Sequence, residues 1–212
     1  MSIENNLKAI TNSIPDNVTL VAVSKTKPNT AIEEAYEAGQ RVFGENKVQE
    51  MATKAESLPK DIKWHLIGHL QKNKVKYIAP FVSLIHGVDS YSTLQEIDKQ
   101  ARKNNRIIDC LLQAKIATEE SKFGMSFAEI NSILNSFKDT PLPHIKVVGL
   151  MGMASFTKEK NQVSQEFNSL KSFFETTKLE ILSMGMSGDY KLAIQEGSTM
   201  VRIGSAIFGS RD

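Results

Sequence analysis

The chain has 212 residues, of which 41% are hydrophobic and 24% charged, and its formal net charge is +2. This composition is that of a globular protein, and the near balance of charge argues against a nucleic-acid or membrane partner. The longest apolar runs have the length of a strand, well below the ~20 residues that a membrane helix needs. A single cysteine, Cys110, excludes an internal disulfide, and the N-terminus has no secretory pattern, so we expect a cytoplasmic protein.

Apolar strand patterns alternate with amphipathic helix patterns along the whole chain. The predicted strands cover residues 18–24, 41–43, 62–67, 82–88, 107–116, 145–150, 179–184 and 200–203. The predicted helices cover residues 2–13, 30–38, 47–57, 71–79, 92–103, 126–137, 159–177 and 189–195. Strands that alternate with helices form a parallel sheet, and eight of them predict a closed (β/α)8 TIM-type barrel in the α/β class.

No linker or repeat divides the chain, so we expect one domain over residues 1–212. Only nine residues follow the last predicted strand, too few for a full closing helix. The leading helix is therefore expected to stand in for the missing last helix. Lys72, Lys74 and Lys76 lie close together and are interpreted as a solvated helix face.

In such barrels the functional residues lie at the carboxyl ends of the strands. Lys25 follows the buried first strand, and Glu45 and Asn46 follow the second. A partly desolvated lysine at this position can attack a carbonyl and form a Schiff base. The alternative is a lysine that extends to solvent from a strand end.

Gly/Ser turns follow the last two predicted strands, at 185–189 and at Gly204 and Ser205. Loops at these two strands commonly bind phosphate in barrels, where helix N-termini favour an anion. In the alternative interpretation, Ser187 or Asp189 is an ordinary helix N-cap.

Other polar residues in the strands have alternative interpretations. Arg202 lies within an apolar strand, where it needs either a buried carboxylate or a ligand as partner. Cys110 is interpreted as a small buried hydrophobe rather than a nucleophile. His65 and His69 are four residues apart, but they span a strand and a turn, so no metal site is expected.

Seven short segments resemble those of one family, the pyridoxal phosphate homeostasis proteins, which are single-domain relatives of the alanine racemase N-terminal barrel. The segments are AVSKTKP (22–28), FGENKVQE (43–50), WHLIGHLQKNK (64–74), SKFGM (121–125), GLMGM (149–153), SMGMSGDY (183–190) and GSTMVRIGSAIFG (197–209). Together they are specific, and they are spread over nearly the whole chain in the expected order.

The resemblance implies that pyridoxal 5'-phosphate (PLP) is bound as a Schiff base on Lys25. It places Ser187, Gly204 and Ser205 at the phosphate, Arg202 near the ring nitrogen and Asn46 near the ring. It also implies that Met151 and His65 line the pocket.

The family differs from alanine racemase, which has a second, β-rich domain that supplies an opposing catalytic tyrosine. Racemisation needs an acid or base on each face of Cα, and Lys25 serves only one of them. We therefore expect no catalytic residue and a protein that carries and buffers PLP and so maintains vitamin B6 homeostasis. PLP-dependent enzymes are its expected recipients, and it is expected to be a monomer.

Two alternatives stay open. The first is a PLP-dependent racemase or related enzyme of low activity. The second rests on Lys25 and the phosphate turns alone, without the resemblance: a barrel enzyme that acts on a phosphorylated small molecule through a lysine Schiff base, like an aldolase.

Overall fold

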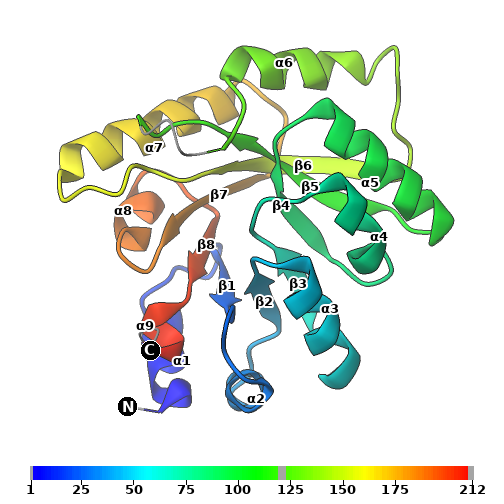
Figure 1. Cartoon of the computed structure of the whole chain (residues 1–212). Helices are drawn as coiled ribbons and strands as arrows, with labels where there is room; N and C mark the ends of the chain where they lie inside the picture. The colour runs from blue at the N-terminus through cyan, green and yellow to red at the C-terminus, as the bar shows by residue number, and fades with distance from the viewer. Residues whose placement is uncertain (1, 119–122, 210–212) are drawn as a thin grey trace.

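The computed structural model describes residues 2–118 and 123–209, and their strands form a closed barrel. The eight strands are parallel and follow one another around the barrel in chain order, as Figure 1 shows. They are β1 (Thr19–Val23), β2 (Val42–Glu45), β3 (Lys63–Leu66), β4 (Leu84–Val88), β5 (Ile108–Ala114), β6 (Ile145–Gly152), β7 (Ile181–Met186) and β8 (Met200–Ile203). The predicted (β/α)8 barrel is therefore confirmed.

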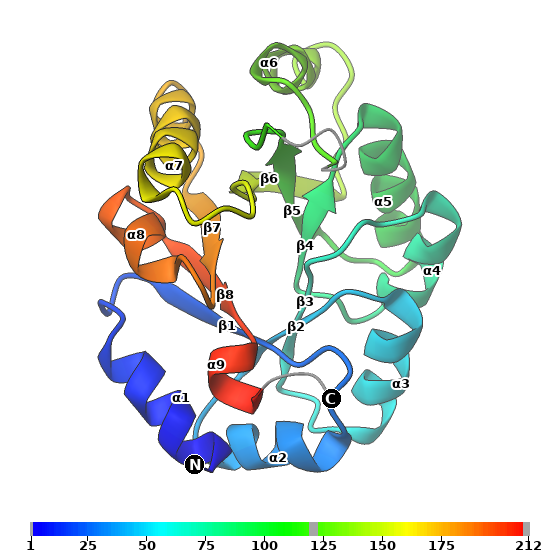
Figure 2. The same ribbon diagram turned by 60° about the vertical axis from the view of Figure 1, so that its left-hand side comes forward.

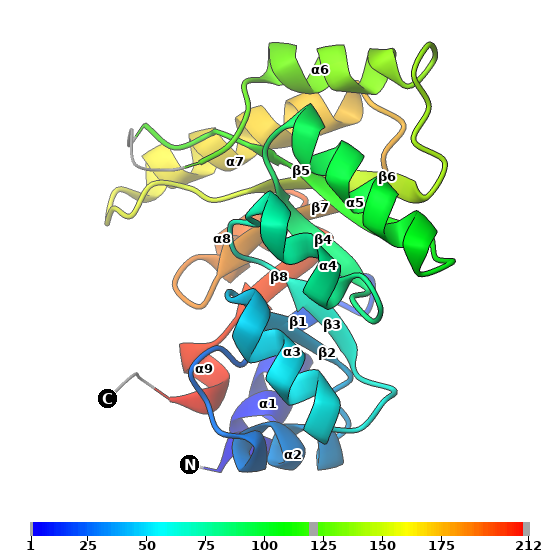
Figure 3. The same ribbon diagram turned by 45° about the vertical axis from the view of Figure 1, so that its right-hand side comes forward.

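Helices surround the barrel on its outer side (Figure 2). They are α1 (Ile3–Asn12), α2 (Asn29–Glu37), α3 (Val48–Ser57), the 3-10 helix η1 (Lys72–Lys74), α4 (Val75–Ile78), α5 (Tyr91–Lys103), α6 (Phe127–Ser136), α7 (Lys160–Glu175), α8 (Tyr190–Gln195) and α9 (Ser205–Phe208). Helices α6 and α7 lie side by side (Figure 3). Between them, Phe127 stacks on Phe173 with ring centroids 4.4 Å apart. Among the described residues, no helix is both long and apolar enough to cross a membrane.

Two apolar layers hold the barrel together, because side chains alternate between its inside and its outside. A small cluster fills the interior and contains Val21, Leu84, Leu111, Val148, Met151 and Met200. A larger cluster lies between the strands and the surrounding helices, and Cys110 is a fully buried member of it. The interior below the strand ends is thus a packed core.

Helix α1 closes the ring between the last and first elements. Its Leu7 is buried, and the Asn6 side-chain amide donates to the carbonyl of Ile207 in α9 at 3.0 Å. A single helical turn, α9, follows β8, which agrees with the expectation that the last residues are too few for a full closing helix. Because α9 has only four residues, α1 still supplies most of the cover on this side, as predicted.

Two segments differ locally from the prediction. Gly44 and Glu45 belong to β2 rather than to a turn, because their carbonyls accept from the backbone N–H groups of Ser24 and Ile67. The predicted helix 71–79 is divided into η1 and α4. The basic cluster lies on this segment, with Lys72 and Lys76 exposed and Lys74 half-buried.

Candidate functional site

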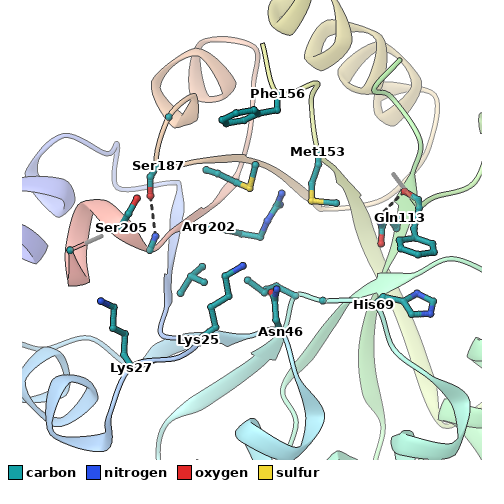
Figure 4. Close-up of a pocket in the computed structure, with 18 residues that line it drawn as sticks. Lys25, Lys27, Asn46, His69, Gln113, Met153, Phe156, Ser187, Arg202 and Ser205 are labelled. Carbon is teal, nitrogen blue, oxygen red and sulfur yellow. Dashed lines mark hydrogen bonds between the residues drawn. The ribbon is translucent and has the colours of Figure 1, made fainter. Parts of the chain in front are cut away.

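A cavity of about 550 Å³ opens at the carboxyl ends of the strands (Figure 4). Its described lining comes from the ends of the strands and from the segments that follow them. The lining residues are Val23, Lys25, Lys27, Asn46, Ile67, Gly68, His69, Gln113, Phe123, Met153, Phe156, Met186, Ser187, Gly188, Arg202, Gly204, Ser205 and Gly209. Three of these side chains are basic, and none of the 18 is acidic, so this part of the wall favours an anionic ligand.

Lys25 lies in the middle of the cavity, with Asn46 beside it and Arg202 nearby (Figure 4). The backbone is held on both sides of this lysine. Before it, the Ser24 carbonyl accepts from Lys54 Nζ at 2.9 Å. After it, the Thr26 N–H donates to Glu50 Oε1 at 2.5 Å, and Thr26 has a φ of 65°, which β-branched residues rarely adopt. These contacts fix the strand end that presents Lys25.

Glu45 supports this strand end from behind and does not line the cavity. Its Oε1 accepts from the Ser24 hydroxyl at 2.6 Å and from Lys54 Nζ at 2.8 Å, and the carboxylate is fully buried. Burial raises the pKa of Glu45, against the opposing effects of Lys54 and Ser24. The sequence thus places Glu45 and Asn46 together, but only Asn46 reaches the cavity.

The two Gly/Ser turns meet at one end of the cavity. The backbone N–H of Gly204 donates to Ser187 Oγ at 3.2 Å, and Ser205 lies beside them in the lining (Figure 4). Asp189 makes no side-chain cap on α8; its Oδ1 instead accepts from the Met186 N–H at 2.5 Å and shapes the turn. Hydroxyl groups therefore gather at this end, as a phosphate site requires.

Arg202 reaches the cavity from inside β8 and is 4% exposed. It donates to Ser183 Oγ at 2.6 Å and to the Gly152 carbonyl at 3.0 Å, and no carboxylate among the described residues pairs with it. Burial lowers its pKa to about 10, so the guanidinium is still charged at neutral pH. Of the two alternatives for this arginine, the buried ion pair is not observed.

Met151 and His65 do not line the cavity. Met151 packs in the interior cluster, and the ring of His65 contacts His86 inside the barrel. Side chains two residues apart in a strand point the same way, so Met153 and Ile67 line the cavity one layer nearer its opening. Counting that alternation to the strand end would have selected Met153 and Ile67 from the sequence.

The end of the cavity far from Ser187 contains His69, which the strand pattern places at a strand end, and Gln113 and Phe123, which it does not. His69 Nδ1 lies 3.1 Å from Asp89 Oδ2, and the His69 ring stacks on Phe123 with centroids 4.7 Å apart. Gln113 donates from Nε2 to the Phe123 carbonyl at 2.9 Å. Phe123 belongs to the SKFGM segment, whose first two residues lie outside the described part of the chain. Only this sequence resemblance pointed to Phe123, and nothing in the sequence pointed to Gln113.

Comparisons with known proteins agree with this geometry. The family model of the alanine racemase N-terminal domain matches residues 1–212. A pyridoxal phosphate homeostasis protein from Aquifex aeolicus is 41% identical over 200 residues, which cover 91% of this chain and 86% of that protein. PipY from Synechococcus elongatus was solved without PLP and with PLP bound, and the two structures have TM-scores of 0.91 and 0.88. They are 35% and 34% identical to this chain, and each match covers 98% of this chain and 100% of PipY.

Alanine racemase from Clostridium difficile is a more distant match. It has a TM-score of 0.81 at 13% identity, and the match covers 99% of this chain but 57% of the racemase. This likeness shows the shared barrel fold alone.

The match over the whole chain makes this protein a barrel of the alanine racemase N-terminal type. Within that class, the identity to the Aquifex protein shows that it belongs to the pyridoxal phosphate homeostasis protein family.

Proposed function

We propose that this protein binds PLP, holds it as a Schiff base on Lys25 and buffers the cofactor for PLP-dependent enzymes. The observation that carries the proposal is the convergence of Lys25, the Ser187–Gly204 turn pair and Arg202 on one cavity. Relatives named for PLP homeostasis and the PLP-bound structure of PipY support the same ligand.

The residues of the cavity fit the chemical groups of PLP. The hydroxyls of Ser187 and Ser205 would hold the phosphate, and Lys25 and Lys27 add positive charge. Arg202 would donate to the ring nitrogen, and Asn46 would lie beside the ring. When bound, PLP supplies an aldehyde that an amine can attack and a ring that withdraws electrons.

Arg202 favours a carrier over an efficient amino-acid enzyme. A guanidinium only donates hydrogen bonds, so it would leave the ring nitrogen without a proton and the ring a weaker electron sink. Three large apolar side chains that line the cavity, Phe123, Phe156 and Met186, are solvent-exposed. Such an open site gives weak electrostatic stabilisation to a carbanion, because water reaches it. We propose that the protein acts in this way as a monomer in the cytoplasm.

The visible absorption spectrum of the PLP-loaded protein tests the covalent link. We expect a Schiff-base band that is lost in Lys25→Ala and kept in Lys27→Ala, a control at another lysine of the same cavity. Reduction with borohydride should add one PLP mass to the peptide that contains Lys25. A loaded protein with no band and no adduct would overturn the proposal.

A weak racemase or related enzyme is the second candidate, and one observation favours it. His69, paired with Asp89, is a titratable group that lines the same cavity as Lys25. Incorporation of solvent deuterium at Cα of a panel of amino acids separates the two functions. A carrier gives negligible exchange and transfers PLP to an apo-enzyme, whereas exchange that is lost in His69→Ala would establish the enzyme.

A further inference from the structure

A chain of four buried polar side chains extends from the cavity into the interior of the barrel. Arg202 Nη1 donates to Ser183 Oγ at 2.6 Å, and this oxygen lies 3.2 Å from His86 Nδ1. On the far side of the same ring, His86 Nε2 lies 3.1 Å from His65 Nδ1. All four residues are at most 6% exposed. Two pairs of consecutive strands supply them, β7 with β8 and β3 with β4, and the bond between Ser183 and His86 joins the two pairs.

The donor and acceptor properties of these four side chains determine the direction of each hydrogen bond between them. A guanidinium can only donate, so Ser183 Oγ accepts from Arg202. Within the described residues, the one acceptor in reach of the Ser183 hydroxyl hydrogen is His86 Nδ1. His86 therefore carries its proton on Nε2 and donates it to His65 Nδ1, which leaves the proton of His65 on Nε2.

Both histidines are neutral in this arrangement. Burial lowers the pKa of His65 to about 3, and it also holds the pKa of His86 well below its ordinary value, with His65 and Arg202 adding to the effect. Two facing acceptors, Ser183 Oγ and the Gly152 carbonyl, hold the guanidinium without neutralising it. Three of its five N–H groups have no partner among the described residues, and Arg202 lines the cavity.

We propose that His86 is a positioning residue, which acts through Ser183 to hold the Arg202 guanidinium directed at the cavity ligand. The proposal rests on the proposed function in that the ligand is taken to be PLP. His65 completes the series, because its Nδ1 accepts a hydrogen bond from the protonated Nε2 of His86. Arginine has a long side chain that loses rotamer entropy when it is ordered, so a fixed acceptor behind it reduces the cost of ordering it for the ligand.

Nitrogen NMR of the ligand-free protein tests the arrangement without any cofactor. We expect His65 and His86 to be neutral, with the proton of each ring on Nε2. A proton on Nδ1 of His86 would overturn the proposal, because Ser183 could not then donate to it. This measurement needs no ligand, so it tests the hydrogen bonds between these side chains even if the protein does not bind PLP. A failure to bind PLP would refute only the proposed function.

Three variants test the effect on binding. His86→Leu removes the acceptor and should weaken PLP binding about tenfold, whereas His86→Asn places an oxygen near Nδ1 and should stay within about threefold of the original. Ser183→Ala should weaken PLP binding to the same extent as His86→Leu. If His86→Leu does not fold, the affinity of Ser183→Ala alone tests the proposal. Unchanged affinity in Ser183→Ala, or in a folded His86→Leu, would overturn the proposal.

A double-mutant cycle separates positioning from general support of the fold. In an Arg202→Met background the effect of His86→Leu on PLP affinity should disappear, because no guanidinium is left to hold. An equal loss of affinity in both backgrounds would show that His86 acts without Arg202 and would overturn the proposal.

Discussion

The hydroxyl oxygen of Ser187 accepts a hydrogen bond of 3.2 Å from the backbone N–H of Gly204, although the two residues follow different strands. The turn after β7 and the turn after β8 are therefore one structural unit. Because Ser187 lines the cavity as well, its hydroxyl can serve the turn and a ligand together.

Ser187→Ala should weaken the binding of PLP about tenfold, because a hydrogen bond to a charged phosphate is lost. Pyridoxal, which has no phosphate, serves as the control ligand, and its affinity should change less than threefold. Titration of both ligands by absorbance measures the two effects. Equal losses for both ligands would show that Ser187 supports the fold of the turn and not the phosphate.

Gly185→Ala should destabilise the protein by about 2–4 kcal/mol, whereas Gly188→Ala should change its stability by less than about 1 kcal/mol. Gly185 has a φ of 95°, and an added Cβ would lie 2.6 Å from the Ala193 Cβ. Gly188 is in the same turn, but an added Cβ would meet nothing within 4 Å. Chemical denaturation of both variants gives the comparison. Similar losses of stability would contradict it.

Lys54→Met should lower the free energy of unfolding by about 3–5 kcal/mol at pH 7, because it leaves the buried Glu45 carboxylate without its cation. Lys146→Met removes a 3.9 Å contact between exposed side chains and should cost less than about 1 kcal/mol. The double variant Lys54→Met, Glu45→Gln should recover part of the loss.

The stability that Lys54→Met loses should be partly regained at acidic pH. Burial already raises the pKa of Glu45, and loss of Lys54 removes an effect that lowers it. For a carboxyl whose folded pKa lies above its unfolded pKa, stability is complete below the unfolded value and is lost as pH rises through the folded value. The deficit relative to the original protein should therefore be smaller at pH 5 than at pH 7. A constant deficit would show that Lys54 acts by packing alone.

The sequence was sufficient for the barrel and for the residues at its strand ends. Alternating strand and helix patterns determine the topology, and Lys25, Ser187 and Arg202 lie at positions that the strand count brings to one cavity. It was harder to predict from the strand pattern which residue of a strand reaches the cavity. Met151 and Met153 point the same way, but Met151 lies in the interior cluster and Met153 lines the cavity, one layer of side chains nearer the opening. The hydrogen-bond and ion-pair partners of buried polar groups could not be predicted from the sequence. Lys54 lies on the same face of α3 as the buried Val48 and Met51, but only the fold shows that its partner there is Glu45.

His65 should make the protein less stable as the pH falls from about 7 toward 3. Its pKa in the folded protein is lowered to about 3, whereas the unfolded chain takes up a proton near the ordinary value of 6.5. The unfolded state then binds more protons than the folded state, so the free energy of unfolding decreases with acidification. Each such histidine contributes at most about 1.4 kcal/mol per pH unit to this slope. Denaturation from pH 7 to pH 4.5 should give a shallower slope for His65→Gln than for the original protein. Identical slopes would mean that His65 takes up its proton as readily in the folded barrel as in the unfolded chain, and would contradict the prediction.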